Sequence, residues 1–353
     1  MDVRDLPRST VAAPTAPSSH RTPTGVRAAG LLVALGALLL VALLSVAVGS
    51  KAIPLGTVIH ELFHYDGSDD GVVIRSLRIP RTLLGLAVGA GLGLAGALMQ
   101  AVTRNPLADP GLLGVNAGAS AAIVTAIGVL HLTSPSAYVW FALAGAAVAA
   151  VLVYVLGSRG RSAATPVRLA LAGAAISAVL GAFISGLVLT DQHAFDDFRF
   201  WSVGSLAGRD LSVLWQTGPF LLAGAVIALA LSRPLNAIAL GDDAGRALGA
   251  HLGRTRAWSI LAITLLCGAA TAAAGPIGFV GLAVAHLARG ITGPDQRWVL
   301  PYSMLLAPTL LLGSDVLGRV IARPSEIEVG ILTAFLGAPV LVLLARRRRL
   351  AAL

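Results

Sequence analysis

About ten long apolar runs dominate the chain, and most of them are long enough to cross a lipid bilayer. They cover residues 28–48, 82–103, 112–130, 137–157, 167–190, 212–232, 257–275, 277–291, 299–318 and 329–345. A membrane-spanning helix needs roughly 20 mostly apolar residues, and these runs are continuous, unlike the alternating strands of a transmembrane β-barrel. Only 12% of the residues are charged, against about 25% in a soluble domain. The sequence therefore predicts an all-α polytopic membrane protein, with about ten transmembrane helices in one domain over residues 28–348.

The segment before the first run has a different character. Residues 1–27 are rich in Pro, Ser, Thr and Arg and show no apolar periodicity, so we expect a disordered tail. The run from Ala28 is too long for a signal-peptide core, and we interpret it as the first span.

The basic residues predict the orientation in the membrane. If the tail lies in the cytosol, the cytosolic segments hold 18 of the 26 Lys and Arg residues. Cytosolic loops carry the excess of such residues in membrane proteins. The ten-span arrangement therefore predicts that both termini are cytosolic. The net charge of +9 is explained by this topology. The sequence shows no face that combines basic and aromatic residues, so nothing in it indicates nucleic-acid binding.

The span interiors hold almost no ionisable side chains. Proton-coupled transporters usually need a buried carboxylate or histidine, so this scarcity disfavours a secondary transporter, and no filter-like segment indicates a channel. An ATP-driven transporter remains, but the only lysine is Lys51, which lies between Ser50 and Ala52. A Walker A loop needs Gly-Lys followed by Ser or Thr. We therefore expect a non-enzymatic subunit whose ATPase is a separate chain.

One motif points to an enzyme instead. His60-Glu61-Leu62-Phe63-His64 matches the HExxH pattern of zinc hydrolases, in which two histidines on one helix face bind zinc and the glutamate acts as base. The connection that holds it has only about 30 residues, which is too short for a protease domain. The favoured interpretation is an amphipathic interfacial helix over residues 54–65, with an intramembrane zinc protease as the alternative. We expect no metal and no cofactor elsewhere, because the other histidines show no ligand spacing.

Four segments together resemble one transporter family. They are Arg78-Ile-Pro-Arg-Thr82, Arg104-Asn-Pro-Leu-Ala-Asp-Pro-Gly-Leu-Leu-Gly114, Ala274-Gly-Pro-Ile-Gly-Phe-Val-Gly-Leu282 and His286-Leu-Ala-Arg289. They resemble the FecCD-type permease subunits of ABC importers for iron–siderophore chelates, haem and vitamin B12. The resemblance covers nearly the whole chain, from about residue 30 to 348. Ala285 departs from it, because the family often has proline there.

This resemblance implies an architecture and a set of partners. The fold would be a type II ABC importer permease of ten helices in the plasma (inner) membrane. Two permease subunits, identical or paralogous, would line the path, with ABC ATPase subunits in the cytosol and a substrate-binding protein outside. The implied substrate is an iron–siderophore, with vitamin B12 or haem as alternatives.

The cytosolic connection after the sixth run holds a candidate coupling helix. Residues 241–249 are interpreted as a short helix, because Asp242 and Asp243 suit a positive N-terminal end and Gly249 suits a stop. The resemblance implies that this helix contacts the ATPase through Asp242, Asp243, Arg246, Leu248 and Gly249. A solvated surface helix is the alternative.

Two further sets of residues follow from the resemblance. Arg78, Arg81 and Arg319 lie at the predicted outer ends of spans, and we expect them to dock the binding protein; interfacial anchoring is the alternative. Asn105, Leu107 and Thr165 lie in inner connections and are expected to form a cytosolic gate, which the stiffness of a proline-containing loop would suit; a plain turn is the alternative.

The second span is rich in small residues. Gly85, Gly89 and Gly93 recur every four residues. In lipid, such spacing lets helix backbones approach closely. The pattern predicts tight helix packing, with a central helix beside the substrate path as the second interpretation.

Overall fold

The computed structural model describes residues 23–132, 135–158, 166–247, 249 and 251–346, and every regular element within these ranges is helical. Ten helices occupy the ten predicted spans. They are α1 (Thr24–Ala47), α4 (Ile79–Thr103), α5 (Val115–Gly128), α6 (Pro135–Ser158), α7 (Pro166–Thr190), α9 (Leu211–Ala230), α12 (Leu252–Ala274), α13 (Val280–Thr292), α14 (Gln296–Ile321) and α15 (Val329–Arg346). The all-α prediction is confirmed.

Short helices lie in the connections. They are α2 (Leu55–Phe63), α3 (Asp69–Val72), the π-helical turn η1 (Val73–Arg78), the 3-10 turn η2 (Pro110–Leu113), α8 (Gln192–Ser202), α10 (Ser232–Ala239) and α11 (Asp242–Ala247). Among the described helices, seven are long and apolar enough to cross a membrane, and shorter apolar helices fill the spans of α5, α13 and α15. Together they account for about ten spans.

The first helix begins earlier than predicted. Residues 24–27 already belong to α1, which starts directly after Pro23. Pro23 is the cap residue before the first turn, and its carbonyl accepts a hydrogen bond from the backbone N–H of Arg27 at 3.2 Å. The predicted tail therefore extends too far by four residues, and its remaining part, residues 1–22, lies outside the described residues.

The junction between the seventh and eighth spans is a true break. The backbone leaves α12 at Gly275 with φ +76° and enters α13 after Phe279 with φ +66°. A positive φ at phenylalanine is uncommon and marks a sharp local turn. The prediction of two separate helices here is confirmed.

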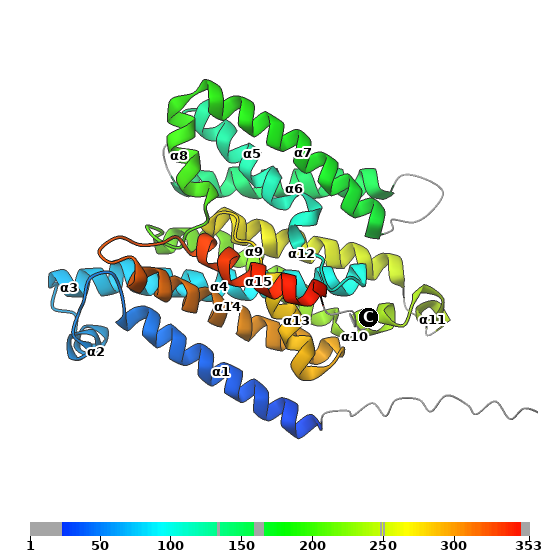
Figure 1. The fold of residues 1–353 in the computed structure, drawn as a ribbon, viewed down its shortest axis with the longest axis horizontal. Helices are drawn as coiled ribbons and strands as arrows, with labels where there is room; N and C mark the ends of the chain where they lie inside the picture. The colour runs from blue at the N-terminus through cyan, green and yellow to red at the C-terminus, as the bar shows by residue number, and fades with distance from the viewer. Residues whose placement is uncertain (1–22, 133–134, 159–165, 248, 250, 347–353) are drawn as a thin grey trace, which may run out of the picture.

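Helix α4 lies in the middle of the bundle and packs against α9, α12, α13 and α14, whereas α5, α6 and α7 form a layer on one side and α1 lies on the other (Figure 1). Its most apolar window is 78% buried, against 6% for α7. A Cβ on Gly93 or Gly96 would overlap the backbone of Ser303 or Gly281, respectively. The glycines therefore permit close helix contact, which confirms the packing interpretation of this span.

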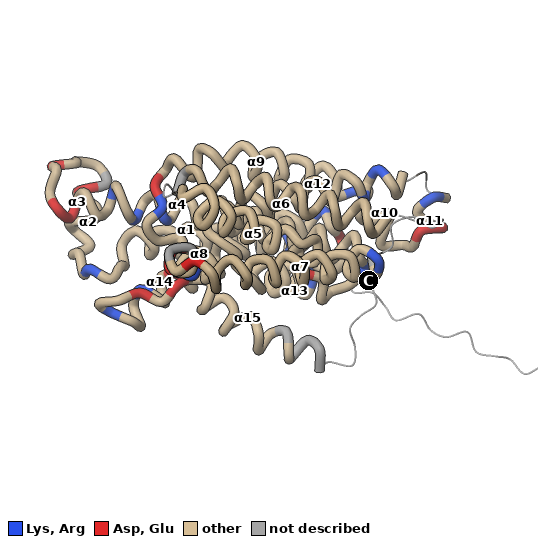
Figure 2. Tube along the Cα trace, turned by 90° about the horizontal axis from the view of Figure 1, so that it is seen from above, with Lys and Arg blue, Asp and Glu red and all other residues tan. Residues whose placement is uncertain are grey.

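Charged residues gather toward the two ends of the bundle, and the middle is nearly free of them (Figure 2). The connections predicted to share a side meet one another. Arg104 pairs with Asp242 at one end, where Asn236 also bonds Asp295. At the other end Arg81 pairs with Glu326. The helices thus present two polar end surfaces, which we call the inner end (around α11) and the outer end (around α2 and α3).

Candidate functional site

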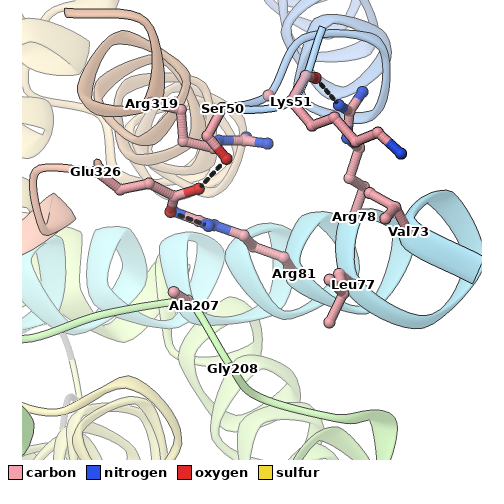
Figure 3. Close-up of a pocket in the computed structure, with 11 residues that line it drawn as sticks. Ser50, Lys51, Val73, Leu77, Arg78, Arg81, Ala207, Gly208, Arg319 and Glu326 are labelled. Atoms are coloured by element: carbon pink, nitrogen blue, oxygen red, sulfur yellow. Dashed lines mark hydrogen bonds and ion pairs between the residues drawn. The ribbon is translucent and has the colours of Figure 1, made fainter. Parts of the chain in front are cut away.

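The three arginines predicted to dock a binding protein converge at the outer end (Figure 3). Arg78, Arg81 and Arg319 are 4%, 8% and 2% exposed, respectively. Together with Lys51 and Glu326 they line a pocket of about 310 Å³. The sequence prediction therefore selected residues that lie together, and all three are largely buried.

Arg78 and Arg319 both donate hydrogen bonds to backbone carbonyls at the C-terminal end of α1. Arg78 donates to the carbonyls of Val46, Ala47 and Lys51 at 3.0, 2.8 and 2.6 Å, respectively. Arg319 donates to the carbonyls of Ser45 and Val48 at 2.9 and 3.0 Å. The last carbonyls of a helix have no partner within the helix. The two guanidinium groups supply the missing donors and fix α1 to η1 and α14.

Asp315 is the shared counter-ion of this cluster. It is fully buried and forms ion pairs with Arg81 at 2.6 Å and with Arg319 at 2.8 Å. Arg81 also pairs with Glu326 at 2.6 Å, and Glu326 accepts a hydrogen bond from Ser50 at 2.9 Å. Burial raises the pKa of Glu326, but the hydrogen bond and charge of Arg81 outweigh burial and hold it below its usual value. Glu326 thus stays ionised and ties the connection before α15 to α4.

These contacts limit how the three arginines can bind a partner protein. Their role in docking stays a prediction. In this conformation the three guanidinium groups are engaged within the chain, so a partner's carboxylate reaches them only through the pocket. The sequence analysis missed Glu326 and the shared role of Asp315. The contacts of Arg81 with Asp315 and Glu326, and of Ser50 with Glu326, join residues 234 to 276 positions apart, whereas Asp315 and Arg319 are four positions apart.

At the inner end, α11 forms where the capped helix was expected. Gly241 and Gly249 flank it with φ +98° and +79°, so the predicted glycine stop adopts the left-handed backbone that favours glycine. Asp243 is fully exposed and pairs with Arg246 at 3.2 Å. Leu248 lies outside the described residues.

Asp242 differs from its neighbour. Its carboxylate forms ion pairs with Arg104 at 2.6 Å and with Arg256 at 2.9 Å. Burial raises the pKa of Asp242, but the hydrogen bond from Arg256 and the charges of Arg256 and Arg104 outweigh it, so the pKa lies below its usual value. The carboxylate is therefore ionised and directed into the protein. Arg104 and Arg256 were missed as its partners by the sequence analysis.

The predicted gate residues begin directly after Arg104. The Asn105 side chain accepts a hydrogen bond from the backbone N–H of Leu107 at 3.0 Å, and Asp109 accepts one from Gly111 at 2.8 Å at the start of η2. Side chains that bond the backbone two residues on stabilise tight turns. Asn105 and Leu107 thus lie in an ordered loop beside α11, whereas Thr165 lies outside the described residues. Their gate role stays a prediction.

The first four residues of the HExxH motif lie on α2, which confirms a helix there, but the helix ends at Phe63 and His64 follows it in an extended conformation. The interfacial position of this helix stays a prediction. The His60 and His64 rings stack with centroids 5.5 Å apart. Glu61 is 1% exposed and accepts a hydrogen bond from Ser68. Among the described residues, no three His, Cys, Asp or Glu side chains gather closely enough to hold a metal ion. The arrangement lacks the third ligand that a catalytic zinc site requires.

The helices and their two polar ends define a polytopic membrane protein. The sequence model of the FecCD transport family matches residues 37–347, which is most of the chain. The chain belongs to this family.

Its relatives cover nearly the same length. The ferric enterobactin transport system permease protein FepD of Escherichia coli is 47% identical over 88% of this chain and 93% of that protein. The Fe(3+)-citrate import system permease protein YfmD of Bacillus subtilis is 41% identical over 87% of this chain and 91% of that protein. A solved structure assigned to the metal-chelate type of ABC transporter, in an inward-facing conformation, superposes with a TM-score of 0.80. It is 28% identical and covers 90% of this chain and 99% of that one.

Proposed function

We propose that the chain is the permease subunit of an ATP-driven importer that carries a ferric siderophore across the plasma membrane, with both termini in the cytosol. The observation that carries this proposal is the similarity to FepD along nearly its whole length. The alternatives implied by the sequence are a permease for haem and a permease for vitamin B12. A competition assay distinguishes these two from a ferric siderophore permease. The iron is cargo within its chelate.

The energy comes from a separate ATPase. The only lysine, Lys51, is followed by Ala52, so the chain has no Walker A lysine followed by Ser or Thr. The candidate ATPase surface is α11 at the inner end. Asp243 and Arg246 are exposed there and pair with each other, which supports a partner contact; we include Leu248 and Gly249 in this surface.

A second permease subunit, identical or paralogous, completes the substrate path. The support is the exposed surface of α7, whose apolar window is only 6% buried in the single chain. The rest of this surface contacts lipid. Asn105, Leu107 and Thr165 are proposed to line the cytosolic gate of the path.

A substrate-binding protein docks at the outer end. The pocket lined by Arg78, Arg81 and Arg319 supports this proposal. Guanidinium groups pair with carboxylates in a fixed geometry, which gives a complex its register as well as attraction. We expect acidic side chains of the binding protein at this pocket.

Affinity purification from membranes in mild detergent, followed by mass spectrometry, tests the proposal. We expect an ABC ATPase in the sample, and a second, similar permease if the path is formed by a heterodimer. Uptake of radioactive iron from a ferric siderophore should be insensitive to excess haem or cobalamin. Loss of the ATPase under conditions that preserve other ABC complexes, or competition by haem or cobalamin, contradicts the corresponding part of the proposal.

A further inference from the structure

A single carboxylate joins three elements at the inner end of the bundle. Asp242, the first residue of α11, accepts from Arg104 at the end of α4 at 2.6 Å and from Arg256 in the first turns of α12 at 2.9 and 3.1 Å. We call these three side chains the Arg104–Asp242–Arg256 strut. The Arg256 side chain is only 14% exposed, and those of Arg104 and Asp242 are 31% exposed. Partly buried, charge-assisted contacts of this kind are stronger than surface ion pairs.

The backbone at both ends of the Arg104–Asp242 contact is unusual. Arg104 ends α4 in the left-handed region, with φ +51°. Gly241, directly before Asp242, has φ +98°, and a Cβ placed on it would lie 3.9 Å from the Arg104 guanidinium. A non-glycine residue with positive φ is uncommon and has to be held by its surroundings. The ion pair holds the residue that directly precedes Asn105.

Asp243, the neighbour of Asp242, differs from it in exposure and in the direction of its side chain. Asp243 is fully exposed and pairs with Arg246, three positions along the same helix, at 3.2 Å. The side chains of one short helix thus have two directions. Asp243 and Arg246 face solvent, whereas Asp242 faces the bundle.

We propose that Asp242 is a positioning residue that transmits movement of α11 to the gate loop after α4 and to the start of α12, and that it does not itself contact the ATPase. This inference rests on the proposed function, in which the ATPase pushes on α11. The residues predicted to contact the ATPase are thereby divided by the direction of their side chains. Asp243 and Arg246 belong to the surface that contacts the ATPase, and Asp242 belongs to the Arg104–Asp242–Arg256 strut.

The charge balance of the strut explains why the carboxylate matters. Two guanidinium groups share one carboxylate, so removing its charge leaves two like charges at close range. Like charges at such a distance repel each other, and only salt and solvent screen the repulsion. The end of α4 and the start of α12 would then separate from α11, and a movement of α11 would no longer reach them.

The test compares Asp242→Asn with the matched control Asp243→Asn in the complete importer, in lipid nanodiscs and proteoliposomes. The first readout is hydrogen–deuterium exchange of residues 103–109, which are far in sequence from the substitution; it is also taken on the permease without the ATPase, so that a weakened ATPase contact in Asp243→Asn does not affect it. We expect Asp242→Asn to raise exchange there and Asp243→Asn to leave it unchanged. The second readout is iron imported per ATP hydrolysed, with ferric enterobactin as the probe. We expect Asp242→Asn to lower this ratio about tenfold, since charge-assisted contacts are lost while ATP hydrolysis continues.

A charge swap separates transmission from plain loss of structure. In the triple variant Arg104→Asp, Asp242→Arg and Arg256→Asp, all three charges are reversed, so one guanidinium group lies between two carboxylates and each contact again joins opposite charges; we expect recovery of both readouts. If Asp242→Asn does not assemble, Arg104→Gln breaks one of the two ion pairs and should show the same two changes.

The outcomes also separate this inference from the proposed function. Equal effects of Asp242→Asn and Asp243→Asn on exchange at residues 103–109, or wild-type exchange in Asp242→Asn, overturn the strut whatever is transported. Absence of ATP-dependent iron import in the unsubstituted importer overturns the proposed function, while the exchange measurement still decides the strut.

Discussion

Replacing Asp315 by Asn removes the shared counter-ion of two buried arginines. We expect this change to destabilise the protein by about 3 kcal/mol, the lower end of the cost of breaking a buried ion pair. Asp315 is fully buried, and its ion-pair contacts measure 2.6 Å to Arg81 and 2.8 Å to Arg319. The lower end applies because Arg319 keeps its contacts to Ser45 and Val48, and Arg81 keeps Glu326. Asn has nearly the same shape, so the change reports the charge rather than a cavity.

Unfolding of the purified protein by SDS in mixed micelles, followed by tryptophan fluorescence, measures this effect. The control is Glu326→Gln, which removes a carboxylate whose side chain is 27% exposed. Because solvent screens this second site, we expect a loss of about 1 kcal/mol or less. If the two variants lose the same stability, or if Asp315→Asn unfolds like the unsubstituted protein, the idea of a buried counter-ion shared by two arginines is wrong.

Three further predictions concern other parts of the molecule. Gly96→Ala should lower the free energy of unfolding by about 1–3 kcal/mol, since its Cβ would overlap the backbone of Gly281. Gly181→Ala, with no atom within 4 Å of its Cβ, is the control and should be neutral or slightly stabilising in the same micelle assay. The Arg297 hydrogen bond, with that from Asn236, outweighs burial and lowers the pKa of Asp295 to about 2. A carboxyl with a lowered folded-state pKa stabilises the protein above its unfolded value. That stability should therefore disappear as the pH falls from about 4 to about 2 in thermal unfolding, and Asp295→Asn should lack this pH-dependent component. Elemental analysis of the purified chain should find no stoichiometric zinc; one zinc per chain that is lost in His64→Ala would restore the HExxH hypothesis.

The sequence was sufficient for the helices because the bilayer imposes a simple requirement on them. Each span must be apolar over about 20 residues, and this signal is local. The stop at Gly249 was predicted because glycine at a positive φ is also a local signal, and the break at Gly275 falls between the seventh and eighth apolar runs. The start of α1 at Thr24 was missed because Thr24, Gly25 and Arg27 interrupt the apolar pattern at the end of an apolar helix.

The polar ends were less predictable because their contacts join distant segments. Arg81 and Asp315 are 234 positions apart, and Arg104 and Asp242 are 138 apart. An arginine at a helix end has the same local sequence whether it faces a partner protein or caps a neighbouring helix. The sequence therefore located Arg78 and Arg319 at the outer end, and only the fold shows that they satisfy the carbonyls of α1.

The central claim is that ATP hydrolysis by a separate subunit drives a ferric siderophore through this chain. Proteoliposomes containing the permease, its co-purifying ATPase and the binding protein, supplied with radioactive ferric enterobactin, test it most directly. We predict iron accumulation that requires hydrolysable ATP and ceases with a non-hydrolysable analogue. Accumulation driven by a proton gradient without ATP would contradict the account.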